Sequence, residues 1–204
     1  ESQTRTVTLA PEAGTEAMRR YVGKPASTDV ILQAIRRVGE LGFPELKLYF
    51  LAGLPGETEE DMREMSRLIL QGKETLERLK APTRIVASIS PFVPKAGTPF
   101  EGVAMARPEV LRGHLKLVKG LLSGTGVAVR GEGPQWSLIQ GLLARGDARM
   151  GHVLASLGTN SLASWSKALE DVDTSWLHRE LTVDERPWAL LDSDVTADHR
   201  TVGM

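Results

Sequence analysis

The sequence predicts an α/β fold in which parallel strands alternate with helices, forming part (half) of a TIM-type β/α barrel that a helical extension follows. Two observations lead to this prediction. Apolar, strand-like runs recur at regular intervals over the first two thirds of the chain, and helical patterns lie between them. The strand-like runs are residues 5–10, 45–51, 84–89 and 127–130. We therefore expect a sheet domain over residues 1–133 and a mostly helical extension over residues 134–204.

Each helical pattern has its own start signal. Ser27 or Thr28 can cap the first helix, and Thr58 can cap the second in a capping box with Asp61. The third pattern follows Pro108, a residue favoured in the first turn of a helix. The first three strands are apolar on both faces for most of their length, which is typical of a sheet covered by helices on one side and by a packed interior on the other.

The most distinctive segments come directly after the strands. They are residues 10–15, 53–57, 90–95 and 130–133, and each combines Gly or Pro with a polar group. In β/α barrels the chemistry gathers where strands end, so these segments are the expected site. Glycine in the 53–57 turn permits backbone angles and close approaches that a Cβ would forbid.

Composition excludes several classes of function. With 204 residues, 41% hydrophobic and 25% charged, and a net charge of −1, the chain is typical of a globular protein rather than a duplex-binding one. We expect Arg19, Arg20, Arg36 and Arg37 to be solvated helix positions. There is no apolar run of membrane length and no signal peptide, so we expect a cytoplasmic protein.

Cysteine is absent, which leaves no thiol nucleophile and no thiolate ligand for a metal or an iron–sulfur cluster. The four histidines, at 114, 152, 178 and 199, show no metal-binding spacing, so no metal site is expected. The chain also lacks a GxSxG elbow and a Walker-type phosphate loop.

Three ordered motifs resemble the second half of a radical S-adenosylmethionine (SAM) enzyme. They are Leu-Ala-Pro-Glu-Ala-Gly-Thr at 9–15, Lys-Leu-Tyr-Phe leading into Gly-Leu-Pro-Gly-Glu-Thr at 47–58, and Ser-Pro-Phe-Val-Pro-Lys at 90–95 with Gly-Thr-Pro-Phe at 97–100. More narrowly, the chain is similar to cobalamin-binding-type radical SAM proteins of uncharacterised substrate. The similarity continues through residues 135–137, 144–149 and 187–188 and so covers nearly the whole chain.

The resemblance implies which residues would contact SAM. Polar contacts follow the fourth barrel strand, adenine or ribose packs on the fifth-strand motif, and backbone groups after the sixth strand read the adenine edge. The implied cofactor-binding residues are Glu12, Thr15, Gly53, Leu54, Ser90, Pro91 and Phe92. Arg130 and Glu132 are candidates to face the substrate. Simpler structural roles compete: Glu12 as the cap of the helix after Gly14, Phe92 as a core residue, and Arg130 with Glu132 as surface ion pairs.

One departure from the family is large, because radical SAM enzymes carry a CxxxCxxC motif that this chain lacks. The resemblance implies that the 4Fe-4S cluster and any cobalamin are bound by an N-terminal part of the parent protein. Because the chain starts at Glu1 without an initiator Met, we expect a piece of a longer protein, inactive alone. The alternatives are a non-catalytic half-barrel module completed by another chain, and an aldolase-like barrel, against which the small number of strands argues. The open edge of strand 5–10 also predicts a homodimer. The substrate is unknown.

Overall fold

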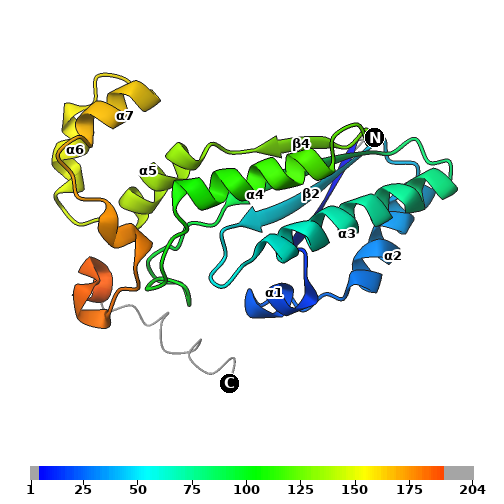
Figure 1. Ribbon diagram of the computed structural model, residues 1–204, viewed down its shortest axis with the longest axis horizontal. Helices are drawn as coiled ribbons and strands as arrows, with labels where there is room; N and C mark the ends of the chain where they lie inside the picture. Colours follow the sequence, from blue (N-terminus) through cyan, green and yellow to red (C-terminus); the bar gives the residue numbers. More distant parts are fainter. Residues whose placement is uncertain (1–4, 191–204) are drawn as a thin grey trace. The chain divides into compact units, whose positions relative to one another are not determined.

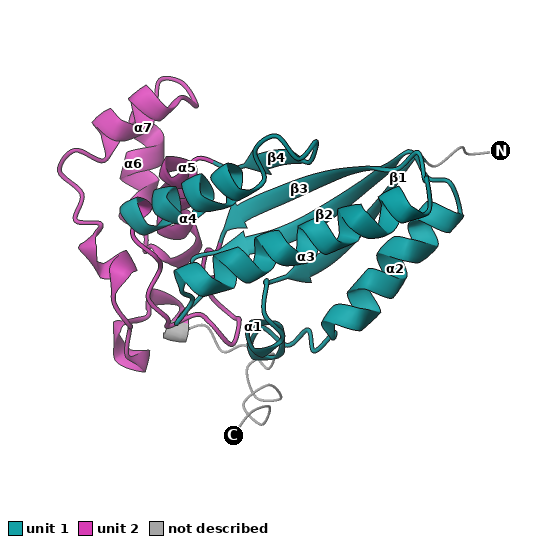
Figure 2. Cartoon of the chain, turned by 45° about the vertical axis from the view of Figure 1, so that its right-hand side comes forward, with its two compact units in different colours: residues 1–91, 109–132 teal, residues 92–108, 133–204 magenta. Residues whose placement is uncertain are grey.

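A computed structural model describes residues 5–190 of the chain (Figure 1). The chain divides into two compact units (Figure 2). Unit 1 comprises Glu1–Pro91 and Glu109–Glu132, and unit 2 comprises Phe92–Pro108 and Gly133–Met204. The segment 92–108, which leaves the third strand, therefore groups with the C-terminal residues rather than with the sheet.

Unit 1 is built on a four-stranded sheet in the order β1-β2-β3-β4, with every neighbouring pair parallel. The strands are β1 (Thr6–Glu12), β2 (Glu45–Ala52), β3 (Arg84–Pro91) and β4 (Ala128–Gly131). Strand order follows chain order because each crossover adds the next strand beside the last one. The predicted α/β architecture with four parallel strands is confirmed, and the sheet is open, as in part of a barrel.

The helices of unit 1 begin where the sequence supplies a cap. Ser27 caps α2 (Thr28–Glu40) by accepting a hydrogen bond from the Val30 amide, at 3.2 Å. Thr58 caps α3 (Glu59–Arg78) in the predicted capping box. The remaining helices are α1 (Glu16–Tyr21), which Thr15 caps, and α4 (Pro108–Leu121).

Helices α2, α3 and α4 cover one face of the sheet (Figure 2). A Cβ placed on Gly72 of α3 would lie 2.7 Å from Ile35 Cδ1 of α2 and 3.8 Å from Ile85 Cδ1 of β3. At the other side, a Cβ on Gly131 of β4 would lie 3.2 Å from Leu115 Cδ2 of α4. The core of unit 1 therefore lies between this face of the sheet and the helices.

The opposite face of the sheet is polar, which corrects the expectation of strands apolar on both faces. Along β2 the buried residues alternate with residues of the other face, where Lys47 is half-buried and Tyr49 is 40% exposed. Register places Ser88 of β3 beside Tyr49 and Arg130 of β4 beside Ser88. The alternation is hard to recognise in the sequence because Leu51 and Val86 interrupt the polar positions of this face.

Unit 2 is helical, as predicted for the extension. Its elements are α5 (Pro134–Arg145), α6 (Met150–Ser156), α7 (Leu162–Ala168) and the 3₁₀ turns Ser175–His178, Val183–Glu185 and Pro187–Leu190. Arg145 is fully buried and donates to the carbonyls of Val103 (2.8 Å) and Leu177 (3.1 Å), which ties α5 to the segment 92–108 and to the 3₁₀ turn Ser175–His178. No helix in the described part of the chain has the length and apolar character needed to span a bilayer.

Candidate functional site

The parallel sheet brings the carboxyl ends of its strands to one edge. Glu12 is the last residue of β1, Gly53 directly follows β2, Pro91 ends β3 and Gly131 ends β4. The loops that carry most of the predicted site residues therefore start from the same edge of unit 1. Among these loops, the loop after β1 and the turn after β2 are held by several hydrogen bonds and ion pairs.

Glu12 has a backbone conformation that is uncommon for a residue with a side chain. Its φ is 67°, and the register of β1 against β2 shifts between Leu9 and Glu12. A left-handed residue other than glycine at a strand end is strained and is enriched at functional sites. The carboxylate of Glu12 forms an ion pair with Lys24 at 2.5 Å.

The expectation that Glu12 caps the following helix is wrong. Thr15 caps α1 instead, because its Oγ1 accepts a hydrogen bond from the Met18 amide at 3.3 Å. Threonine one residue before the helix has the side-chain geometry for this bond, whereas Glu12 lies too early in the chain. The Glu12 carboxylate is therefore not used in a helix cap.

Arg19 holds the loop after β1 from inside, which corrects the expectation that this residue is solvated. Its side chain is fully buried, and the guanidinium donates to the carbonyls of Gly14 (2.7 Å), Ala13 (3.1 Å) and Ala26 (2.7 Å) and to Thr28 Oγ1 (2.8 Å). Burial lowers the pKa of Arg19. The guanidinium nevertheless stays protonated, as arginine does in proteins. The planar fork of donors matches several carbonyls at once.

The loop after β1 also contacts α3 directly, through Gly14. A Cβ on Gly14 would lie 2.3 Å from the Met65 amide nitrogen and 2.4 Å from the Asp61 carbonyl oxygen. Both distances are far inside van der Waals contact, so only glycine permits this approach of loop and helix.

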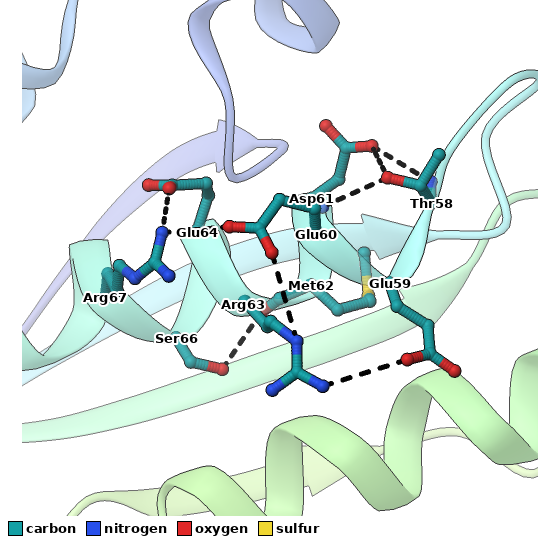
Figure 3. Close-up of polar contacts among 9 residues, drawn as sticks. All are labelled: Thr58, Glu59, Glu60, Asp61, Met62, Arg63, Glu64, Ser66 and Arg67. Atoms are coloured by element: carbon teal, nitrogen blue, oxygen red, sulfur yellow. Dashed lines mark hydrogen bonds and ion pairs between the residues drawn. The ribbon is translucent and has the colours of Figure 1, made fainter.

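Asp61 joins the loops that follow β1 and β2. Its Oδ1 accepts a hydrogen bond from Thr15 Oγ1 at 2.7 Å, and its Oδ2 accepts from the amide and hydroxyl of Thr58, at 2.9 and 2.8 Å. Figure 3 shows the Thr58 part of this network at the start of α3. Burial acts to raise the pKa of Asp61, but these hydrogen bonds outweigh it and lower the pKa. The carboxylate therefore stays ionised and links the two helix caps.

The turn after β2 is closed by its own glutamate. Gly53 has a φ of 86°, and its amide donates to Glu57 Oε2 at 2.5 Å. The Glu57 side chain is only 1% exposed. Leu54, predicted to pack against adenine or ribose, is 3% exposed and lies in the core. One buried carboxylate thus fixes the backbone of the turn, in a conformation that glycine at position 53 permits.

The remaining predicted residues are less organised. Ser90 is half-buried and Pro91 is buried at the end of β3. Phe92 is 8% exposed and packs edge-to-face on Phe100 with ring centroids 5.6 Å apart, which agrees with its interpretation as a packing residue. Arg130 and Glu132 are exposed, and no ion pair is recorded for either within residues 5–190.

Sequence reasoning missed three residues that build this site: Arg19, Asp61 as a link between loops, and His114. The contacts that give them these roles span 5 to 57 positions of chain, so no local pattern marks them. His114 Nδ1 of α4 lies 3.3 Å from Glu57 Oε2, and the two side chains are 8% and 1% exposed. Among residues 5–190, no group of three His, Asp or Glu side chains could hold a metal ion.

Comparison with known proteins gives a family for the segment that carries most of this site. Residues 1–69 match the family model described as the radical SAM superfamily. The chain is also 31% identical, over 150 residues, to the protein described as "Uncharacterized protein MJ0966" of Methanocaldococcus jannaschii. That match covers 74% of this chain but only 32% of the relative, so the chain spans about a third of the relative's length. No solved structure matches significantly. The matched segment 1–69 includes both organised loops, so the part of the chain that carries them is similar to the radical SAM superfamily.

Proposed function

We propose that this chain supplies the nucleoside-binding side of a radical SAM active site. The observation that carries the proposal is the paired loop structure at the carboxyl edge of the sheet. Glu12 is held at a φ of 67° and Gly53 at 86°, and buried polar contacts fix both loops. The strained conformation of Glu12, held in place by its surroundings, is a feature of preorganised binding sites, whereas glycine adopts a positive φ without strain.

The residues of this chain fit SAM but do not fit the 4Fe-4S cluster. The Glu12 carboxylate can accept hydrogen bonds from ribose hydroxyls or from the ammonium group of SAM. Gly53, which is buried in the turn after β2, keeps a side chain out of the space beside which an adenosine would pack. No residue of this chain fits the 4Fe-4S cluster, because cluster irons are held by thiolates and the chain has no cysteine. We propose that the rest of the parent protein binds the cluster, and cobalamin where the parent uses it.

The free edge of β1 in the open sheet supports the proposal that another strand pairs with it. Among the described strands, β1 pairs only with β2, so its other edge presents unpaired backbone groups. Such an edge is a template for another strand. We propose that the N-terminal part of the parent enzyme pairs there, and that a second copy of the chain takes its place when the chain is isolated.

A first prediction concerns iron. After anaerobic reconstitution with iron and sulfide, the purified chain should retain no 4Fe-4S cluster, since it provides no thiolate ligand. Iron and sulfide analysis together with visible absorption measures this. A radical SAM protein with its cysteines, carried through the same protocol, is the positive control. Stoichiometric iron and sulfide on this chain would contradict the prediction.

A second prediction tests the nucleoside site itself. We expect the chain to bind SAM and S-adenosylhomocysteine weakly, since both carry the adenosyl group. Glu12→Gln should weaken both affinities by about tenfold, because a charge-assisted hydrogen bond is lost. Isothermal titration calorimetry measures both affinities. The matched control is Glu40→Gln, an exposed glutamate at the far end of α2 that pairs with Arg36. The proposal fails if neither ligand binds, or if the two variants have the same affinity.

A further inference from the structure

The contact between Glu57 and His114 is buried and polar, and neither the loop contacts nor the proposed ligand contacts explain it. Glu57 Oε1 and His114 Nδ1 are both buried and have no hydrogen-bond partner in the described part of the chain. Nδ1 nevertheless lies 3.3 Å from Glu57 Oε2, the same oxygen that accepts the Gly53 amide. Buried polar atoms of this kind are rare, and each one needs a physical explanation.

A carboxylate that is 1% exposed is unfavourable in the interior unless polar groups compensate it. One backbone amide, that of Gly53, is the only hydrogen-bond donor recorded for Glu57 among residues 5–190. The imidazole of His114 is a second polar group within contact distance of this carboxylate. Glu57 therefore depends on both partners to remain in place.

His114 brings the required rigidity because it is part of a packed helix. It lies on the buried side of α4 together with Leu111, Leu115 and Val118. The Glu57 side chain is thus held between the backbone of its own turn and a helix that follows the third strand. Loss of the imidazole would leave the carboxylate with one donor and an apolar neighbour.

We propose that His114 is a positioning residue: through Glu57 it fixes the Gly53 turn at the carboxyl end of β2. The contact between His114 Nδ1 and Glu57 Oε2, at 3.3 Å, stands on geometry alone. Its consequence for ligand binding rests on the function proposed above, since the Gly53 turn is there assigned to the adenosine.

The first experiment follows amide hydrogen exchange of Gly53 by NMR. His114→Leu should accelerate exchange at Gly53 by about tenfold or more, because the carboxylate that accepts its amide proton loses its support. The amide of Ala87, in the centre of β3 and fully buried, is the reference for global opening. His114→Asn, whose side-chain amide can still donate to Glu57, should keep most of the protection.

Three results would overturn the proposal. They are an unchanged Gly53 exchange rate in His114→Leu, an equal acceleration at Gly53 and Ala87, and His114→Asn behaving like His114→Leu. If His114→Leu does not fold, a double-mutant cycle of Glu57→Gln and His114→Ala, which removes the ring nitrogens, decides. A non-additive effect on Gly53 exchange supports the contact, and additivity overturns it.

The second experiment measures S-adenosylhomocysteine affinity by calorimetry in the same variants. His114→Leu should weaken binding by about tenfold while His114→Asn retains it. His152→Leu, an exposed histidine of α6, is the control and should change nothing. Equal affinity of His114→Leu and wild type overturns the link to the ligand. If the wild type does not bind, the proposed function fails, and the exchange data still test the role of His114.

Discussion

Replacing Gly14 with alanine is expected to destabilise the chain by about 3 kcal/mol or more, because the added methyl group overlaps the backbone of α3. A Cβ would lie 2.3 Å from the Met65 nitrogen and 2.7 Å from the Met65 Cα. Backbone atoms of a helix cannot turn aside as the end of a flexible side chain can. The loop after β1 must therefore separate from α3, which also breaks the hydrogen bond from Thr15 to Asp61. Urea unfolding followed by circular dichroism measures the change.

The control for this prediction is Gly113→Ala in α4. A Cβ on Gly113 has no atom within 4 Å. Alanine there should stabilise the chain by about 0.5–1 kcal/mol, because glycine is unfavourable inside a helix. If the two variants unfold at the same urea concentration, the close approach of Gly14 to α3 does not exist in solution.

The second large effect is expected at Arg19. Arg19→Met keeps most of the apolar stem but should cost about 3–5 kcal/mol, because buried carbonyls lose their donors. Ala13, Gly14 and Ala26 all depend on this guanidinium. The same variant should weaken S-adenosylhomocysteine binding, since Gly14 and Thr15 belong to the loop that presents Glu12. Thermal unfolding and calorimetry measure the two effects.

Arg20→Met is the matched control, because Arg20 is the next residue of the same helix. Its side chain is 62% exposed and lies 3.8 Å from Glu16. Exposed ion pairs contribute little, so we expect a change of about 0.5 kcal/mol or less. Arg19→Lys should not restore stability, because one ammonium group cannot reach four acceptors in the plane of a guanidinium. A stable Arg19→Met variant, or full rescue by lysine, would contradict the role assigned to Arg19.

The sequence predicted the elements of this fold well where the signals are local. β2 starts at Glu45 and β3 at Arg84, as the apolar runs indicate, and the strands extend only one or two residues further than expected. Ser27 and Thr58 cap their helices as predicted, because a cap needs only a side-chain oxygen and an amide two or three residues later. The parallel arrangement followed from the alternation of strands and helices, and it alone brings the candidate residues to one edge.

The sequence indicated where the loops of the candidate site lie. They follow the ends of the strands, and glycine, proline and polar residues mark them in the sequence. The roles inside those loops could not be assigned in this way. Glu12 was expected either to contact SAM or to cap a helix, and only the backbone position of Thr15 excludes the cap.

By itself, then, the sequence determined the α/β architecture, the caps of α2 and α3 and the absence of a cluster ligand, because each depends on residue type and short-range spacing. Only the tertiary structure decided which of two adjacent arginines is buried, since Arg19 and Arg20 have identical side chains and differ only in the direction in which α1 presents them. The same holds for His114, whose contact with Glu57 joins residues 57 positions apart that become neighbours only when α4 packs beside the turn after β2. Burial and long-range contact are properties of the packed chain, and no local pattern contains them.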